Sequence, residues 1–219
     1  MSVTLRAGPV MHTAGGDVFE FMQSELTLER GDFRAPALGV ELGIAANDRF
    51  DVALGFTWSE TETESEFREW MEEVDGVDQP IRQTTRFRTL PVTASLRFYP
   101  MARGERISEL VWVPRSTTPY IGAGAGMVPY RLRQEGDFVQ EEDLSIYPDV
   151  VESKGTGWTA HALAGLDHWL SPRVALNLEA RYAVGSADPE GDFSPGPGGE
   201  WERIDLGGFQ AGIGLSFRW

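Results

Sequence analysis

The last twelve residues of the chain, 208–219, alternate strictly between apolar side chains and small or polar ones. One face carries Phe209, Ala211, Ile213, Leu215, Phe217 and Trp219, and the other carries Gly208, Gln210, Gly212, Gly214, Ser216 and Arg218. Because successive side chains of a β-strand point to opposite faces, this segment is expected to be a strand with one apolar face. Such a face must be buried in something apolar, which is either a protein core or lipid.

Similar alternation recurs along the chain between clusters of Gly, Pro, Asp and Asn, as is typical of short antiparallel strands. The eight predicted strands are 3–12, 34–46, 50–66, 82–99, 119–133, 157–170, 173–185 and 204–219. A chain of 219 residues fits one all-β domain, residues 1–219, because barrels run long as single units. We therefore predict an all-β fold, an eight-stranded antiparallel up-and-down β-barrel.

The connections between these strands alternate in length. Long loops are expected at 13–33, 67–81, 134–156 and 186–203, and tight turns at 47–49 and 171–172. Transmembrane barrels have an even number of strands, short periplasmic turns and long extracellular loops, which would place both termini in the periplasm. Segment 100–118 is too long for a simple turn, and we expect residues 108–113 to form an extra strand piece or a short helix.

The less apolar face of the strands distinguishes a membrane barrel from a soluble one. A soluble barrel turns its large apolar side chains inward, whereas a membrane barrel turns them toward lipid. Here the less apolar face is small and charged, with four acids and four bases. We predict that these form an interior ion network that seals the barrel: Arg6, Glu41, Asp51, Arg97, Asp167, Glu179, Arg181 and Arg218.

Three glycines, Gly122, Gly124 and Gly126, fall on the interior face of one predicted strand. They leave space inside the barrel, and eight strands enclose an interior just wide enough for side chains to fill. We expect the space to be filled by Tyr99, Trp169 or arginine side chains.

The strand 50–66 continues past Trp58 with four glutamates on its apolar parity, Glu60, Glu62, Glu64 and Glu66. The bilayer is expected to end near Trp58, because even one Arg or Lys at the bilayer midplane costs roughly 2–4 kcal/mol and acids somewhat less. An antiparallel register that pairs Phe50 with Phe98 also pairs the glutamates with arginines. The predicted extracellular ion ladder joins Glu60 to Arg88, Glu62 to Arg86 and Glu66 to Arg82. Alternatively, Arg82, Arg86 or Arg88 contacts lipopolysaccharide phosphates.

Composition excludes several classes of function. The net charge of −15 argues against nucleic acid as a partner, since nucleic acid demands a concentrated basic surface. The chain has no cysteine, so disulfides and thiolate metal sites are excluded, and it has no apolar run long enough for a transmembrane helix. Residues 1–6 do not resemble a secretory signal, so we take the chain to be the mature form with a starting Met added.

The histidines offer no catalytic constellation in the sequence. Catalysis needs a nucleophile and a base within hydrogen-bond reach, and His12, His161 and His168 have no serine two residues away on the same face. Asp167 and His168 are neighbours on a strand and point to opposite sides. The acidic loops lack an EF-hand or a glycine-rich calcium repeat, so we expect a solvated surface there, with a specific Ca²⁺ site as the alternative. No catalytic residue, cofactor or metal is predicted.

Four stretches resemble the OmpA/OmpX/OmpW-like eight-stranded outer-membrane β-barrel superfamily: residues 119–126, residues 90–93 leading into Phe98 and Tyr99, residues 166–172, and the terminal strand. The resemblance covers essentially the whole chain. It implies a Gram-negative outer membrane, with its lipid and lipopolysaccharide as surroundings. It also implies that Phe217 and Trp219 belong to the signal read by the barrel assembly machinery. A terminal Trp in place of Phe, the segment 100–118 and the acidic loops depart from the family pattern.

The expected function is a structural or surface-interaction role for a barrel with a side-chain-plugged interior and an unidentified extracellular partner. One alternative is a porin-like channel or transporter for small or apolar solutes. Others are a soluble ligand-binding barrel and, as the weakest, a lipid-modifying enzyme.

Overall fold

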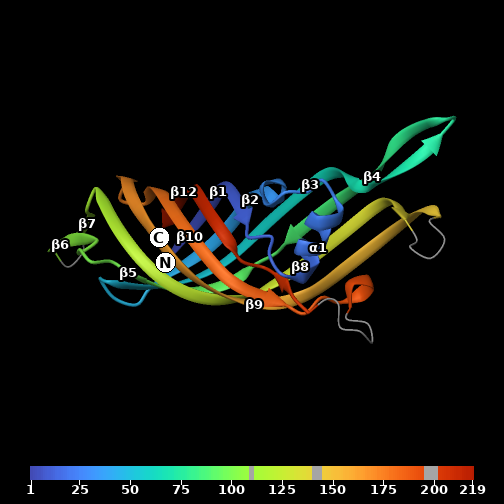
Figure 1. The fold of residues 1–219 in the computed structure, drawn as a ribbon. Helices are drawn as coiled ribbons and strands as arrows, with labels where there is room; N and C mark the ends of the chain where they lie inside the picture. The colour runs from blue at the N-terminus through green and yellow to red at the C-terminus, as the bar shows by residue number, and fades with distance from the viewer. Residues whose placement is uncertain (109–110, 140–144, 195–201) are drawn as a thin grey trace.

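The chain closes into a barrel (Figure 1). The computed structural model describes residues 1–108, 111–139, 145–194 and 202–219. The wall consists of β1 (Ser2–His12), β2 (Arg34–Ala45), β3 (Phe50–Val74), β4 (Val77–Thr89) with β5 (Val92–Phe98), β8 (Thr117–Val139), β9 (Ile146–Ser171), β10 (Val174–Ala187) and β12 (Gly208–Arg218). Neighbouring strands are antiparallel, and β12 pairs with β1 to close the ring. The predicted eight-stranded barrel is confirmed.

The apolar faces of the strands form the outer wall of the barrel. Ile213 of β12 lies opposite Ala7 of β1, and its side chain is 54% exposed, while Leu38 of β2 is 56% exposed. Similar exposure holds for Leu5, Leu54, Leu96, Ile121, Tyr182 and Phe217. Soluble monomers rarely expose an apolar surface of this extent. The strand alternation therefore places its apolar side toward lipid, as predicted.

Two connections predicted as long loops are strands instead. The expected loop 67–81 is a hairpin in which β3 runs to Val74 and β4 starts at Val77, and much of the expected loop 134–156 belongs to β8 and β9. Asp75 and Gly76 have φ of 53° and 77°, as a two-residue hairpin turn requires. The extended strands project from one end of the barrel (Figure 1). The prediction failed because this part of the wall carries charges in place of an apolar face.

The connection 13–33 covers the end of the barrel from which the long strands project. It contains helix α1 (Asp17–Glu25) and the short helix η1 (Arg30–Phe33). Apolar residues of this segment pack with inward residues of β4 and β8 and with β11 (Ile204–Asp205) and η2 (Gly191–Phe193). The cluster includes Val18, Phe19, Met22, Phe33, Phe87, Leu132, Phe193 and Ile204. No helix in the described ranges is long and apolar enough to span a membrane.

Within segment 100–118, β6 (Gly104–Ser108) and β7 (Val111–Pro114) pair as a separate small hairpin. The expected extra piece 108–113 overlaps the end of β6 and most of β7, and its residues 109–110 lie outside the described residues. Arg103, just before β6, reaches back to the barrel. It donates two hydrogen bonds to the Asp51 carboxylate, at 2.6 and 2.7 Å. The hairpin thereby contributes a side chain to the barrel interior, at the end that holds both chain termini (Figure 1).

Candidate functional site

A carboxylate at the centre of the barrel, that of Glu179 on β10, binds four other side chains. Its oxygens lie 3.0 Å from Arg6 Nη1 and 3.1 Å from Arg181 Nη2, and they accept hydrogen bonds from Arg97 Nη2 and, at 2.9 Å, from the Tyr120 hydroxyl. The Glu179 side chain is 2% exposed. An ion this deeply buried requires such partners, because desolvation costs several kcal/mol per ion.

Glu41 on β2, across the lumen, lies close to the same three arginines. Arg97 Nη1 lies 2.6 Å from Glu41 Oε1, while Arg6 and Arg181 lie 3.8 and 3.7 Å from Oε2. We call Arg6, Glu41, Arg97, Glu179 and Arg181 the central cluster. It joins β1, β2, β5 and β10 across the lumen. Three guanidinium groups thus face two carboxylates.

The other three predicted interior ions, Asp51, Asp167 and Arg218, lie outside the central cluster and have other partners. Asp51 pairs with Arg103, which was not predicted. Asp167 accepts hydrogen bonds from Asn177 Nδ2 at 2.7 Å and from the Tyr99 hydroxyl at 3.4 Å. The Arg218 guanidinium lies 5.9 Å from the Trp169 ring centre.

Two uncharged side chains connect these groups and were missed. Asn177 accepts a hydrogen bond from Arg6 Nη2 at 2.7 Å and donates to the Tyr120 hydroxyl at 2.8 Å. Asn177 therefore links the central cluster to Asp167, and Tyr120 also lies under the Arg97 guanidinium, 4.7 Å from its ring centre. Both residues have interior parity in the sequence, but a search for charged residues passes over them.

The side chains nearest to the interior glycines come from the neighbouring strands β5 and β9. A Cβ at Gly124 would lie 2.1 Å from the backbone oxygen of Ala94 and 2.7 Å from His161 Nε2. Leu163 similarly approaches Gly122, and Thr93 approaches Gly126. Side chains of the neighbouring strands β5 and β9 therefore occupy this space, and not Tyr99 or Trp169.

The expectation that no histidine reaches a nucleophile is wrong. His161 Nε2 on β9 lies 2.8 Å from Ser95 Oγ on β5, and His168 Nδ1 lies 2.9 Å from Thr117 Oγ1. A search for local pairs missed the first contact because 66 residues separate its partners. Ser95 is only 4% exposed and lies inside the barrel, where a lipid chain outside the wall does not reach it. Within the described ranges, no three His, Cys, Asp or Glu residues are grouped to hold a metal.

The charged hairpin pairs in the register derived from the sequence, with Glu60 opposite Arg88, Glu62 opposite Arg86 and Glu66 opposite Arg82. Arg88 Nε lies 2.6 Å from Glu60 Oε2, Arg82 Nε lies 3.2 Å from Glu66 Oε1, and Arg86 binds Glu62. These pairs lie on the outer surface of the projecting strands.

Strand β8 adds cations to this surface that the sequence argument did not include. Arg131 lies opposite Arg88, and Arg133 opposite Arg86. Such like-charge neighbours are unfavourable alone, and each is offset by an acid. Arg131 binds Glu152, and this hydrogen bond lowers the pKa of the Glu152 carboxyl. Arg133 lies 3.0 Å from Glu135.

A double-mutant cycle on Glu62 and Arg86, each changed to Ala, is expected to give a coupling energy of about 0.2–1 kcal/mol, because both side chains are solvent-exposed. Urea unfolding of the refolded barrel in lipid vesicles measures it. A coupling energy above about 2 kcal/mol would contradict an exposed ion ladder and indicate a desolvated pair.

The closed ring, the apolar outer wall and the charged interior define a transmembrane β-barrel. The chain belongs to the family described as outer membrane protein beta-barrel domain, whose model matches residues 13–217. It is a bacterial outer-membrane protein, and the predicted superfamily and location are confirmed. No curated protein matches the chain.

Two solved structures share the fold. One is the outer membrane protein OprG from Pseudomonas aeruginosa, at 15% identity and a TM-score of 0.53, with 99% of this chain and 94% of that chain covered. The other is Neisserial surface protein A (NspA), at 13% identity and a TM-score of 0.51, with 100% of this chain and 96% of that chain covered. At these identities, the likeness concerns the fold alone.

Proposed function

We propose that this protein is a non-conducting outer-membrane barrel with a structural or surface-interaction role. The central cluster carries this proposal. Its guanidinium and carboxylate groups come from four strands and meet across the lumen. The single carboxylate of Glu179 binds three arginines and Tyr120. A hydrated ion that passes must break these contacts, each of which offsets the desolvation of a buried charge.

A second closure lies toward the projecting end of the strands. There α1 and η1 pack against the inner side of the wall, and Phe19 and Phe33 contact Phe87 of β4 edge-on. Current through the barrel would require this apolar cap and the central cluster to open together. Because the cap closes the lumen, the outer surface of the extended strands is the part of the protein best placed to contact partners.

The surroundings that we propose are outer-membrane lipid and lipopolysaccharide. Arg82, Arg86 and Arg88 of the ladder, with Arg131 and Arg133, lie on the outer surface beyond the apolar wall, where lipopolysaccharide phosphates are found. Because the ladder arginines are paired with glutamates, their primary role is to hold the hairpin together. Phe217 and Trp219, which project from the outer wall at the end of the chain, are proposed as the signal for the barrel assembly machinery.

Planar-bilayer recording of the refolded protein tests the closure. We expect no steady current from the wild type and a steady current from a variant that combines Arg97→Ala and Glu179→Ala. Heat-dependent mobility on SDS gels, recorded for both proteins, shows that each has folded. A stable unitary current from the wild type would favour the porin-like alternative, and uptake of uncharged solutes by vesicles would favour a transporter.

We also propose that the protein is not an enzyme. The Ser95 and His161 pair is the arrangement closest to a catalytic one in the described residues, and its burial supports a structural role. Incubation of the vesicle-embedded protein with lipid A is expected to leave the acyl chains intact by mass spectrometry. Acyl release that is lost in Ser95→Ala would overturn this proposal.

A further inference from the structure

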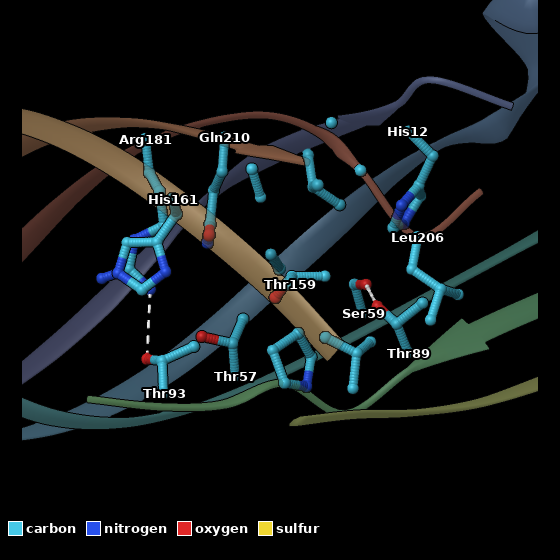
Figure 2. A pocket seen from close by; sticks show the side chains of 17 residues that line it. His12, Thr57, Ser59, Thr89, Thr93, Thr159, His161, Arg181, Leu206 and Gln210 are labelled. Atoms are coloured by element: carbon cyan, nitrogen blue, oxygen red, sulfur yellow. Dashed lines mark hydrogen bonds between the residues drawn. The ribbon is translucent and has the colours of Figure 1, made fainter. Parts of the chain in front are cut away.

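A cavity of about 60 Å³ lies inside the barrel between the central cluster and the apolar cap. Figure 2 places Arg181 and His161 at one end of it and His12 and Leu206 at the other. Arg181 belongs to the central cluster, and the His12 ring contacts Phe87 of β4, on which the cap packs, edge-on, with ring centres 4.9 Å apart. Since a buried water takes about 10–15 Å³ by this measure, the cavity holds about four to six water-sized groups.

Each end of the cavity has a polar side chain with an unpaired atom. His12 is 8% exposed, and its Nε2 has no hydrogen-bond partner. Arg181 is 9% exposed; its Nη1 and Nη2 donate to Thr93 and Glu179, but its Nε has no partner. A buried polar atom without a partner is unfavourable, so these two atoms indicate a bound ligand. The Arg181 Nε–H is a donor and calls for an acceptor, whereas the imidazole nitrogen is a donor or an acceptor according to its tautomer and is satisfied by a hydroxyl, which can act as both.

The charge of the lining selects for an anion. Among the described residues that line the cavity, Arg181 carries the only formal charge, and none is acidic. Arg181 is one of the three guanidinium groups of the central cluster, and the two carboxylates of the cluster leave it with a net charge of +1. The potential at the Arg181 end is therefore positive. The wall between the ends is formed largely by Val10, Ala37 and Val128 with threonine side chains such as Thr57 and Thr159, which suits a short carbon chain.

We propose that this cavity binds a small hydroxycarboxylate, with the carboxylate at Arg181 and the hydroxyl at His12. The carboxylate of the ligand pairs with the cationic Arg181 end, its hydroxyl forms a hydrogen bond with the His12 imidazole, and its carbons contact the apolar wall.

3-Hydroxypropionate, which carries its carboxylate and hydroxyl at opposite ends of a short carbon chain, is the probe that tests this site. In ¹⁵N-labelled protein in detergent micelles, 3-hydroxypropionate is expected to shift the side-chain signals of Arg181 and His12 in a saturable way. 3-Hydroxypropionamide, which has the same shape without the charge, and chloride are expected to leave them in place. No saturable change with 3-hydroxypropionate would overturn the proposal, and so would an equal change with chloride, because the cavity would then hold an inorganic anion only.

Two variants give the test a structural control. Ala183→Ile fills the cavity and is expected to weaken 3-hydroxypropionate binding at least about tenfold, or about 1.4 kcal/mol, whereas Ala180→Ile on the lipid-facing side of the same strand is expected to leave it unchanged. Equal affinities in the two folded variants would contradict the site.

His12→Phe keeps an aromatic ring against Phe87 but removes the nitrogen that meets the ligand hydroxyl. It is expected to abolish the preference for 3-hydroxypropionate over propionate, and a retained preference would overturn the assignment of His12. The site does not depend on the barrel being closed to current, so the bilayer recording and the 3-hydroxypropionate titration can fail separately.

Discussion

Replacing Glu179 with Ala is expected to lower the free energy of unfolding by about 3–5 kcal/mol, because removal of one partner from a buried ion cluster leaves uncompensated charge. Arg6, Arg97 and Arg181 would then face Glu41 alone, and the Tyr120 hydroxyl would lose its acceptor. Urea unfolding in lipid vesicles, followed by gel mobility, measures the loss.

The matched control for this variant is Glu62→Ala, which also removes one glutamate from an arginine pair but on the exposed ladder. Its cost is expected to stay below about 1 kcal/mol, since solvent screens the pair. Glu179→Gln keeps the shape and part of the hydrogen bonding and is expected to fall between them. Equal losses for Glu179→Ala and Glu62→Ala would mean that the central cluster is hydrated and would weaken the proposed closure.

Replacing Phe87 with Ala is the second change with a large expected effect, a loss of about 3–5 kcal/mol from an aromatic core position. Phe87 is 1% exposed, and its ring centre lies 4.9 Å from that of His12, 5.3 Å from that of Phe19 and 6.4 Å from that of Phe33. The ring is therefore one of the points at which the wall holds α1 and η1, beside the bridge between Leu26 and Phe67.

Limited proteolysis of the vesicle-embedded variant measures the release of this cap. Cleavage within 13–33 is expected to accelerate in Phe87→Ala and to remain at the wild-type rate in Phe56→Ala, whose ring projects outward from the lipid-facing wall. If both variants are cleaved at the wild-type rate, contacts other than Phe87 hold the cap.

The sequence by itself determined which face of each strand meets lipid and how β3 pairs with β4 and β5. Side-chain alternation assigns the faces, because a slip of one residue would turn every apolar side chain of a strand inward. The register of the charged hairpin was determined twice over, since Phe50 opposite Phe98 and Glu60 opposite Arg88 require the same pairing. The faces follow from alternation within one strand, and the register follows from pairing between strands that are neighbours in the sequence.

Only the tertiary structure decided which interior groups meet. Arg6 reaches Glu179, Ser95 reaches His161 and Asp51 reaches Arg103 across a lumen whose shape depends on how the ring closes. Alternation states that a side chain points inward, but not its height in the barrel or the strand that it faces, because strand tilt and stagger are properties of the closed ring. The cap of α1 and the cavity beneath it likewise exist only once β4, β8 and β12 enclose a common space.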